Sequence, residues 1–510
     1  MRFVILTLAA LVLTSACSAT KAKAMQADQN ETAILKSFLT ALNSKDKATI
    51  QAFVDANCTK QMAARVDRMV SVSNQGAPFT LVSVVRSEPT KISAQISNAN
   101  GVPISLSLMF DLSGKISGVM LRVGGNAPSK DYSNWTDLGK LAEAIRADSS
   151  APAMAISVLH DGKIETAASG IREVGNGDAV KPNDPFSIGS IGKPLCSTVI
   201  GKLIEMGKLR WDETLAEALP KTPMKDAYKA VTIEEILHHR GGIPEELNMR
   251  RPDVLRIVNG ATDPIVIREN YARDILSKDP IGKPDEKFAY SNGGYALLGH
   301  IAERVTGKRY EQLVKEMIFE PLGMKNSYTN MDTLPEARPA GHVDANDQQG
   351  NGNGTPSGKW QPVHFSGPIE ILFAPAGGGM FCSAEDLVKF GRMHMDGLNG
   401  KDGLLKASTV QRLHQGIPED LVVDSPADIH EPYTATQDQR LYACGWGIEA
   451  DPGVEIMHTH NGSNGTMRAQ LSIFPKAGVV VAAFVNCGGE SEPSPPLQAA
   501  LAVAQRYAKG

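Results

Sequence analysis

The sequence predicts a mixed α/β fold of the α+β kind, in which helices and strands occupy separate stretches of the chain. Two observations predict it. Helical patterns precede a run of alternating strand patterns between residues 30 and 123, and strand patterns lie at both ends of a mainly helical region over residues 200–330. The 510 residues, 42% of them hydrophobic and 21% charged, suffice for two or three globular domains with sizeable cores.

Composition and charge argue against several classes of partner and cofactor. The net charge is −4 and the isoelectric point about 6.3, and no basic stripe runs along the chain, so we expect no nucleic-acid partner. The chain has no phosphate-binding G-x-x-x-x-G-K-[ST] loop and no clustered Cys and His spacing typical of zinc. We therefore expect neither a metal ion nor a cofactor.

The N-terminus has the pattern of a secretory signal, which we assign to residues 1–24. An apolar run over residues 4–13 is too short to span a membrane. It ends in Leu13-Thr-Ser-Ala-Cys17, which resembles a bacterial lipobox, although Thr14 is less usual there than Leu. We favour lipidation of Cys17, which would attach the protein to a membrane of the bacterial cell envelope. The alternative is plain cleavage to a periplasmic protein, near Ala16 or Ala19 or after Ala24.

Residues 26–124 are expected to form a small α+β domain. Two helical patterns over about 30–57 precede strand patterns at 80–85, 91–96, 104–110 and 115–121, with turns at Asn100-Gly101 and Ser113-Gly114. This order resembles that of a small cone-shaped domain of the NTF2-like or cystatin-like kind. The resemblance rests on the order of the elements and not on a sequence motif. No catalytic constellation lies there, so we expect a spacer or binding role with an unknown partner. Residues 125–134 follow as a linker.

Residues 135–510 are expected to form the second domain. A helix over 137–146 precedes a hairpin over 155–168 that turns at Asp161-Gly162. Near the other end, strands at 468–474 and 479–485 flank a turn at 475–478, and a helix runs over 497–507. Residues 345–360 are rich in Asn, Gly and Gln and predict an exposed loop.

Ser190 and Lys193 are the most informative pair in this domain. They open an apolar helical segment that ends at Gly207, so a spacing of three residues places both on one face of the helix. A neutral Lys amine can then activate a Ser hydroxyl, which is a poor nucleophile alone. The alternative is that Ser190 caps the helix. The same spacing recurs at Ser18–Lys21 and Ser44–Lys47, so only context favours Ser190.

Two further segments supply candidate partners. Tyr290-Ser-Asn292 precedes a helix that ends near Gly307; Tyr290 would relay a proton, and the Asn292 amide would bind a substrate carbonyl or Lys193. His460 would donate to a substrate carboxylate or join the relay, and Gly462 would let substrate approach closely. Taken alone, each has an ordinary alternative: a turn before a helix, and a structural histidine.

These motifs together resemble the serine β-lactamase and penicillin-binding protein superfamily. Phe186-Ser-Ile-Gly-Ser-Ile-Gly-Lys193, Tyr290-Ser-Asn292 and His460-Asn-Gly462 are similar to the three motifs of its class C β-lactamase-related branch of DD-peptidases, D-aminopeptidases and esterases. Supporting stretches fall between them in family order: 236–244, 320–324, 376–387 and Gly445-Trp-Gly447. The resemblance covers about 135–508 and implies a β-lactamase-like fold, an antiparallel sheet flanked by helices plus a mainly helical subdomain.

The resemblance also implies a mechanism. Lys193 with Tyr290 would deprotonate Ser190, which would form an acyl-enzyme with a small ester, amide or D-amino-acid peptide. The backbone N–H groups of Ser190 and Ser463 would form the oxyanion hole. Asn292 would orient the acyl group, and His460 would support the relay.

Two departures and three alternatives qualify this interpretation. His460 stands where dedicated β-lactamases carry Lys, and His238-His-Arg-Gly241 differs from the commoner Thr-His-Thr-Ser. A catalytically weak binder of penicillin or peptidoglycan fragments and a low-activity β-lactamase both remain open. A thiol enzyme using Cys196 lacks a matched base motif. We expect Cys196 to be a small buried residue, and the odd number of cysteines apart from Cys17 leaves at least one free thiol: Cys58, Cys196, Cys382, Cys444 and Cys487.

Overall fold

Two units of the chain have hydrophobic cores of their own. In this computed structural model they comprise Met1–Lys130 and Asp131–Gly510. The structure describes residues 33–59, 62, 66–88, 91–99, 101, 103–110, 114–123, 132–244, 251–346, 358–363, 368–419, 421–422, 433–436, 439–450, 454–489 and 493–508. The signal segment, Cys17 and most of the expected linker lie outside these residues.

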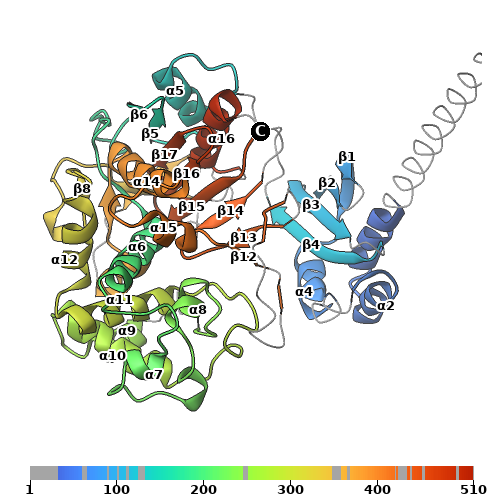
Figure 1. The fold of residues 1–510 in the computed structure, drawn as a ribbon. Coiled ribbons are helices and arrows are strands. Elements are labelled where there is room, and N and C mark those ends of the chain that lie inside the picture. The colour runs from blue at the N-terminus through green and yellow to red at the C-terminus, as the bar shows by residue number, and fades with distance from the viewer. Residues whose placement is uncertain are drawn as a thin grey trace, which may run out of the picture. The chain divides into compact units, whose positions relative to one another are not determined.

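The smaller unit is an antiparallel sheet packed against helices (Figure 1). A helix over 33–43 precedes α2 (Lys47–Asn57) and α4 (Val66–Gly76). The strands pair in chain order: β1 (Thr80–Glu88), β2 (Lys91–Ser97), β3 (Pro103–Phe110) and β4 (Ile116–Val123). All four strand predictions are confirmed. Helix α4 is not predicted by its sequence pattern, because its apolar side chains are mostly β-branched and are mixed with serines.

A second antiparallel sheet organises the larger unit. Its strand order is β12-β13-β14-β15-β16-β17-β5-β6. The bounds are β5 (Ala153–His160), β6 (Lys163–Gly170), β12 (Ile417–Pro418), β13 (Leu441–Tyr442), β14 (Gly447–Glu449), β15 (Met457–Ser463), β16 (Arg468–Phe474) and β17 (Val479–Val485). The β5–β6 hairpin turns at Asp161 and Gly162, both with positive φ, as the sequence predicts.

Helices cover both faces of this sheet (Figure 1). Alternate residues of β17 belong to the cores on opposite faces of the sheet. Val481 and Ala483 pack against α5 (Leu138–Asp148) and α16 (Pro495–Tyr507), while Ala482 and Phe484 join the core on the other face. The second face carries α14 (Ala384–Leu398), with α6 (Gly192–Glu205) and α15 (Ala407–Leu413) beyond it. A continuous apolar strand such as β17 therefore lies between two cores.

The region between β6 and β8 is mainly helical, as predicted. After β7 (Phe186–Ser187) and α6 it contains α7 (Leu215–Ala218), α8 (Ile233–Leu237), α9 (Arg251–Val258), α10 (Pro264–Leu276), α11 (Asn292–Thr306) and α12 (Tyr310–Val314). Shorter elements follow: β8 (Ser327–Tyr328), β9 (Gly341–Asp344), β10 (Trp360–Val363), α13 (Pro368–Leu372) and β11 (Phe381–Cys382). The predicted loop 345–360 joins β9 to β10 and lies largely outside the described residues.

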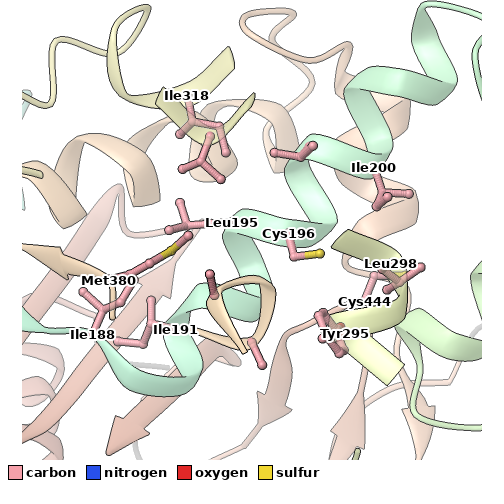
Figure 2. Close-up of a cluster of buried hydrophobic side chains, with 14 of the residues drawn as sticks. Ile188, Ile191, Leu195, Cys196, Ile200, Tyr295, Leu298, Ile318, Met380 and Cys444 are labelled. Atoms are coloured by element: carbon pink, nitrogen blue, oxygen red, sulfur yellow. The ribbon is translucent and has the colours of Figure 1, made fainter. Parts of the chain in front are cut away.

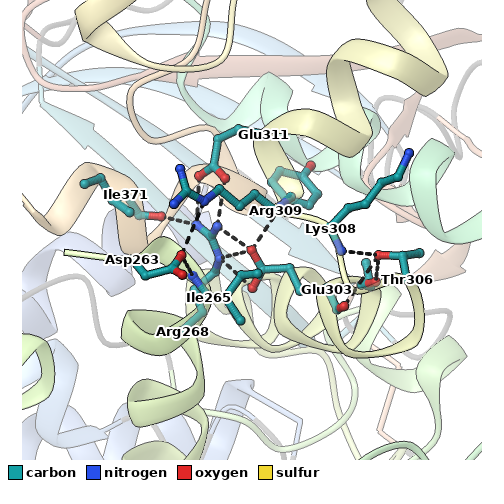
Figure 3. Close-up of polar contacts among 11 residues, drawn as sticks. Asp263, Ile265, Arg268, Glu303, Thr306, Lys308, Arg309, Glu311 and Ile371 are labelled. Carbon is teal, nitrogen blue, oxygen red and sulfur yellow. Dashed lines mark hydrogen bonds and ion pairs between the residues drawn. The ribbon is translucent and has the colours of Figure 1, made fainter. Parts of the chain in front are cut away.

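A buried ion network holds the helical region together (Figure 3). Arg268 on α10 is fully buried and forms ion pairs with Glu303 on α11 and Glu311 on α12, at 2.6 and 2.9 Å. It also donates to the Ile371 carbonyl of α13. One guanidinium thus connects four helices, including the helix that begins at Asn292.

In the part of the chain that the structure describes, no helix is long and apolar enough to cross a membrane.

Candidate active site

Ser190 lies in a tight turn immediately before α6. The turn is the 3-10 helix η1 (Gly189–Ile191), which joins β7 to α6. The N-cap position of α6 is Ile191, which makes no side-chain cap bond, so Ser190 does not cap the helix. Instead the Ser190 Oγ lies 3.2 Å from the Nζ of Lys193. The three-residue spacing brings the pair together, although through a 3-10 turn and not within the α-helix itself.

Glycines let strand β15 pack directly against this turn. Gly189 has a φ of 49°, and a Cβ there would collide with the backbone of Ser463. A Cβ on Gly462 would collide with the Ile188 carbonyl and lie 3.1 Å from the backbone nitrogen of Ser190. The backbone nitrogen of Ser463 therefore lies beside the turn that carries Ser190. The structure accounts for Gly462 by this packing, and the approach of substrate to it stays a prediction.

Lys193 connects two of the predicted segments. Its side chain is fully buried, and its Nζ donates to the Oδ1 of Asn292 at 2.6 Å. The same nitrogen lies 4.5 Å from the centre of the Tyr290 ring. The start of α6 is buried all round, and its apolar side chains Leu195 and Cys196 lie in one cluster with Ile188, Met380 and Leu298, which holds the helix turn that carries Lys193 (Figure 2). Four of the predicted residues thus lie together: Ser190, Lys193, Tyr290 and Asn292.

The Tyr290–Asn292 segment is shaped by the start of α11. Ser291 is the N-cap, and its hydroxyl accepts from the Gly294 N–H at 2.9 Å and donates to the Pro244 carbonyl at 2.8 Å. Asn292 begins the helix and is 4% exposed. The turn-before-helix interpretation is therefore confirmed, and the cap places Tyr290 and Asn292 on either side of Ser291 at the start of α11, while their catalytic roles stay predictions.

His460 occupies a strand that the sequence analysis did not predict. It lies in β15, opposite Leu471 of β16, and is 4% exposed. Its Nδ1 donates to the Asn461 carbonyl at 2.6 Å, and its Nε2 lies 3.1 Å from the hydroxyl of Tyr442. Burial, and then the charge of Lys193, lower the pKa of His460 to about 3. Both ring nitrogens thus have partners within the protein, which favours the relay role over the binding of a substrate carboxylate.

Two residues that the sequence analysis did not assign complete this cluster. His239 follows α8 and contacts the Tyr290 segment, and Tyr442 of β13 lies between His239 and His460. Burial, and then the charge of Lys193, hold the pKa of His239 well below its usual range. The available signals were weak: His239 belongs to one of four H-x-G patterns, and Tyr442 stands just before Gly445-Trp-Gly447.

The look-alike motifs have ordinary structural roles. The Ser44 hydroxyl donates to the Ala41 carbonyl at 2.7 Å in the turn before α2. Tyr132-Ser-Asn134 repeats the Tyr-x-Asn pattern of Tyr290-Ser-Asn292, and its Tyr132 hydroxyl donates to Asp148 at 2.6 Å. Ser18 lies outside the described residues. Packing, and not spacing, therefore separates the candidate site from its look-alikes.

The cysteines of the larger unit are buried side chains of its cores. Cys196 is fully buried, and burial raises its pKa to about 12, so its thiol is unreactive. All five cysteines that the structure describes are free and buried. Among the described residues, no group of three or more His, Cys, Asp or Glu side chains is arranged to hold a metal ion.

A hollow of about 980 Å³ lies away from Ser190, beside α8, α15 and β13. Neither Ser190 nor Lys193 lines this hollow. Its charged and polar lining residues include Glu234, Glu235, His238, Asp285, Arg412, His414 and His458. Its location alone assigns it no chemistry.

Comparisons with known proteins agree on the larger unit. The family model described as Beta-lactamase matches residues 138–505. Penicillin-binding protein 4 of Amycolatopsis lactamdurans is 29% identical over 368 residues, which are 70% of this chain and 86% of that protein. The octameric penicillin-binding protein homologue from Pyrococcus abyssi superposes with a TM-score of 0.56 at 26% identity, over 72% of this chain and 77% of its own. D-amino acid amidase from Ochrobactrum anthropi SV3, at 20% identity, shares the fold with a TM-score of 0.56 over 72% of this chain and 96% of its own.

Proposed function

The chain belongs to the beta-lactamase family, and from that premise we propose that it is a serine hydrolase that acts through an acyl-enzyme on Ser190. The single observation that carries the proposal is the position of the Lys193 amine, 3.2 Å from the Ser190 hydroxyl and 2.6 Å from the side-chain Oδ1 of Asn292. A Ser hydroxyl needs an adjacent base to act as a nucleophile, and a neutral Lys amine within hydrogen-bond reach can be that base. The proposal requires this amine to be neutral when it accepts the Ser190 proton, and burial favours the neutral form because the charged form loses its hydration. The effect of Lys193 on the pKa of His239 and of His460 belongs to its charged form.

Tyr290 completes the acid–base group in this proposal. Together with Lys193 it takes the proton of Ser190, protonates the leaving group and then activates the water that releases the acyl group. The contact of its ring with the Lys193 amine supports this role. Because the Oδ1 of Asn292 accepts from Lys193, its amide N–H₂ is the group left to orient the acyl carbonyl.

The oxyanion hole is assigned to the backbone N–H groups of Ser190 and Ser463. The packing of β15 against the η1 turn supports it, since it brings the strand that carries Ser463 directly against the turn that carries Ser190. A donor of this kind typically contributes about 10²–10³ in rate.

The substrate class in this proposal is a small ester, an amide or a D-amino-acid peptide. The name of the Amycolatopsis relative, a penicillin-binding protein, and that of the amidase with the same fold support acyl groups of this kind. His460 favours an esterase or D-peptidase over a dedicated β-lactamase, because it stands at the position of the Lys of those enzymes. A fold by itself does not select among these substrates.

The test is a fluorophosphonate probe followed by a hydrolysis panel of nitrophenyl esters, a chromogenic cephalosporin, D-Ala-D-Ala peptides and D-aminoacyl amides. We expect Ser190→Ala to abolish both labelling and turnover. Ser44→Ala is the matched control, because Ser44 has the same spacing to a lysine but a structural role. Labelling that persists in Ser190→Ala would refute the assignment of Ser190 as the nucleophile. Binding of penicillin without turnover would favour a binding protein over an enzyme.

We also propose that the protein is exported and attached to a membrane through a lipid on Cys17. The support is the sequence Leu13-Thr-Ser-Ala-Cys17 after a short apolar run. Metabolic labelling with a palmitate analogue in a bacterial host should mark the wild type and not Cys17→Ser. Equal labelling of both would contradict it, and a soluble periplasmic wild type would favour plain cleavage.

A further inference from the structure

A chain of three buried side chains connects the Tyr290 segment to strand β15. His239, Tyr442 and His460 come from three separate elements and are 2%, 3% and 4% exposed. The Nε2 of His239 lies 3.2 Å from the Tyr442 hydroxyl, which lies 3.1 Å from the Nε2 of His460. These residues span 221 positions of sequence, from 239 to 460, so only the tertiary structure brings them together.

Backbone groups at both ends fix the direction of every hydrogen bond in this chain. The Ser291 N–H donates to the Nδ1 of His239 at 3.0 Å, so the proton of that ring is on Nε2 and points to Tyr442. At the other end the Nδ1 of His460 carries the proton that is donated to the Asn461 carbonyl. The Nε2 of His460 is therefore an acceptor, and the Tyr442 hydroxyl donates to it. A single arrangement of protons satisfies all four bonds.

His239 also holds the segment that carries Tyr290. Its ring centre lies 4.4 Å from that of Tyr290, and its carbonyl accepts from the Ala289 N–H at 2.8 Å. It has a φ of 58°, a left-handed conformation that is unfavourable for a residue other than glycine and persists only where the surroundings impose it. The chain thus fixes Tyr290 and Ser291 at one end and the strand of Ser463 at the other.

We propose that His239 and Tyr442 are positioning residues of this site. Through one directed hydrogen-bond chain they keep His460 in its Nδ1–H form, and they hold the Tyr290 segment in a fixed position relative to strand β15. This inference rests on the proposed function and extends it to two residues that are assigned no chemical step of their own. The hydroxyl of Tyr442 is the group on which the connection depends, since it is both the acceptor from His239 and the donor to His460.

The kinetic test compares two tyrosine hydroxyls. Tyr442→Phe removes the central link, whereas Tyr295→Phe removes an equally buried hydroxyl that donates to the Leu237 carbonyl at 2.8 Å, outside the chain. With the best substrate of the hydrolysis panel we expect Tyr442→Phe to lower kcat by about 10- to 100-fold. KM should stay within about threefold, because substrate contacts are unchanged. Equal kcat values for the two variants would overturn the inference.

A spectroscopic test does not depend on activity. In ¹⁵N-histidine-labelled full-length protein at pH 7, long-range ¹H–¹⁵N spectra should show His460 as the Nδ1–H form and His239 as the Nε2–H form, with signals assigned through His460→Gln and His239→Gln. Any other pair of tautomers would contradict the proposed hydrogen-bond chain. If wild type shows these forms but no labelling of Ser190, the proposed function fails and the chain is structural only.

Discussion

The Nζ of Lys193 lies 2.6 Å from the Oδ1 of Asn292, although 99 positions separate the two residues along the chain. The contact joins the first turn of α6 to the first residue of α11. A neutral amide oxygen orients the amine without forcing a proton onto it, which a carboxylate at the same position would do. The relationship therefore bears directly on the protonation of the base in the proposed mechanism.

Replacing Asn292 by Asp tests this relationship. The carboxylate would pair with Lys193 and hold the amine in its charged form. We expect kcat/KM at pH 7 to fall by about 10²-fold or more, with part of the loss recovered at higher pH. Asn292→Ala removes the amide without adding a charge and is the control. The same pH profile in both variants would contradict the electrostatic argument.

Lys193→Met should slow the acylation of Ser190 by about 10²–10⁴-fold, because the general base is lost while the apolar stem is kept. The rate of fluorophosphonate labelling measures this step directly. Lys202→Met is the matched control on the same helix, since the Lys202 amine donates to the Leu404 carbonyl at 2.7 Å. Similar labelling rates for the two variants would exclude Lys193 as the base.

Gly462→Ala tests the packing of β15 on the nucleophile turn. The added Cβ meets the Ile188 carbonyl, so the turn or the strand must move, at a cost of about 1–3 kcal/mol. We expect labelling of Ser190 to fall by about tenfold or more, since small displacements of reacting groups are costly. Gly403→Ala, where a Cβ meets no atom within 4 Å, should change neither the stability of the protein nor the labelling of Ser190. Wild-type labelling in Gly462→Ala would show that the close packing is dispensable.

Arg268→Met should destabilise the larger unit strongly. It leaves Glu303 buried and unpaired, which typically costs about 3–5 kcal/mol. Arg273→Met on the same helix breaks only the exposed pair with Glu269, which is worth about 0–1 kcal/mol. Urea unfolding followed by tryptophan fluorescence measures both, because all four tryptophans lie in the larger unit: Trp135, Trp211, Trp360 and Trp446. Adding Glu303→Gln to Arg268→Met should recover part of the loss, and no recovery would argue against a buried charge as the cause.

A chain of three histidines, of which His394 and His414 are buried and His458 is partly buried, should make the larger unit sensitive to acid. His414 lies 3.0 Å from both His394 and His458, nitrogen to nitrogen. Burial lowers the pKa of His394 to about 3 and of His458 to about 4, and holds that of His414 well below its usual range. The unfolded chain therefore binds protons from about pH 6.5 downward that the fold does not, so this stability is present above pH 6.5 and is lost as the pH falls toward 4.

The same tryptophan unfolding assay, repeated between pH 7 and 4, measures whether the free energy of unfolding falls as the pH is lowered. Each histidine that stays neutral contributes a slope of up to about 1.4 kcal/mol per pH unit. His394→Gln should lower stability at pH 7 but flatten the dependence. A slope unchanged by this substitution would assign the acid sensitivity to other groups.

Local regularities of sequence determined most of the fold. The Asp161-Gly162 turn, the end of α11 at Gly307 and the alternation in β16 each depend on neighbouring residues, so their patterns could be recognised directly. Strand β15 could not be recognised. Its sequence Met-His-Thr-His-Asn-Gly-Ser has no apolar alternation, and pairing with β14 and β16 makes it a strand.

The sequence by itself determined that Ser190 and Lys193 lie within reach of each other, because three residues of a helical turn fix that distance locally. It also supplied candidate partners in Tyr290, Asn292 and His460. Only the tertiary structure decided that these segments meet, that Ser190 caps no helix, and that His239 and Tyr442 connect them. Contacts between segments a hundred or more residues apart depend on how buried side chains pack and on which polar groups find partners, and short-range spacing contains neither.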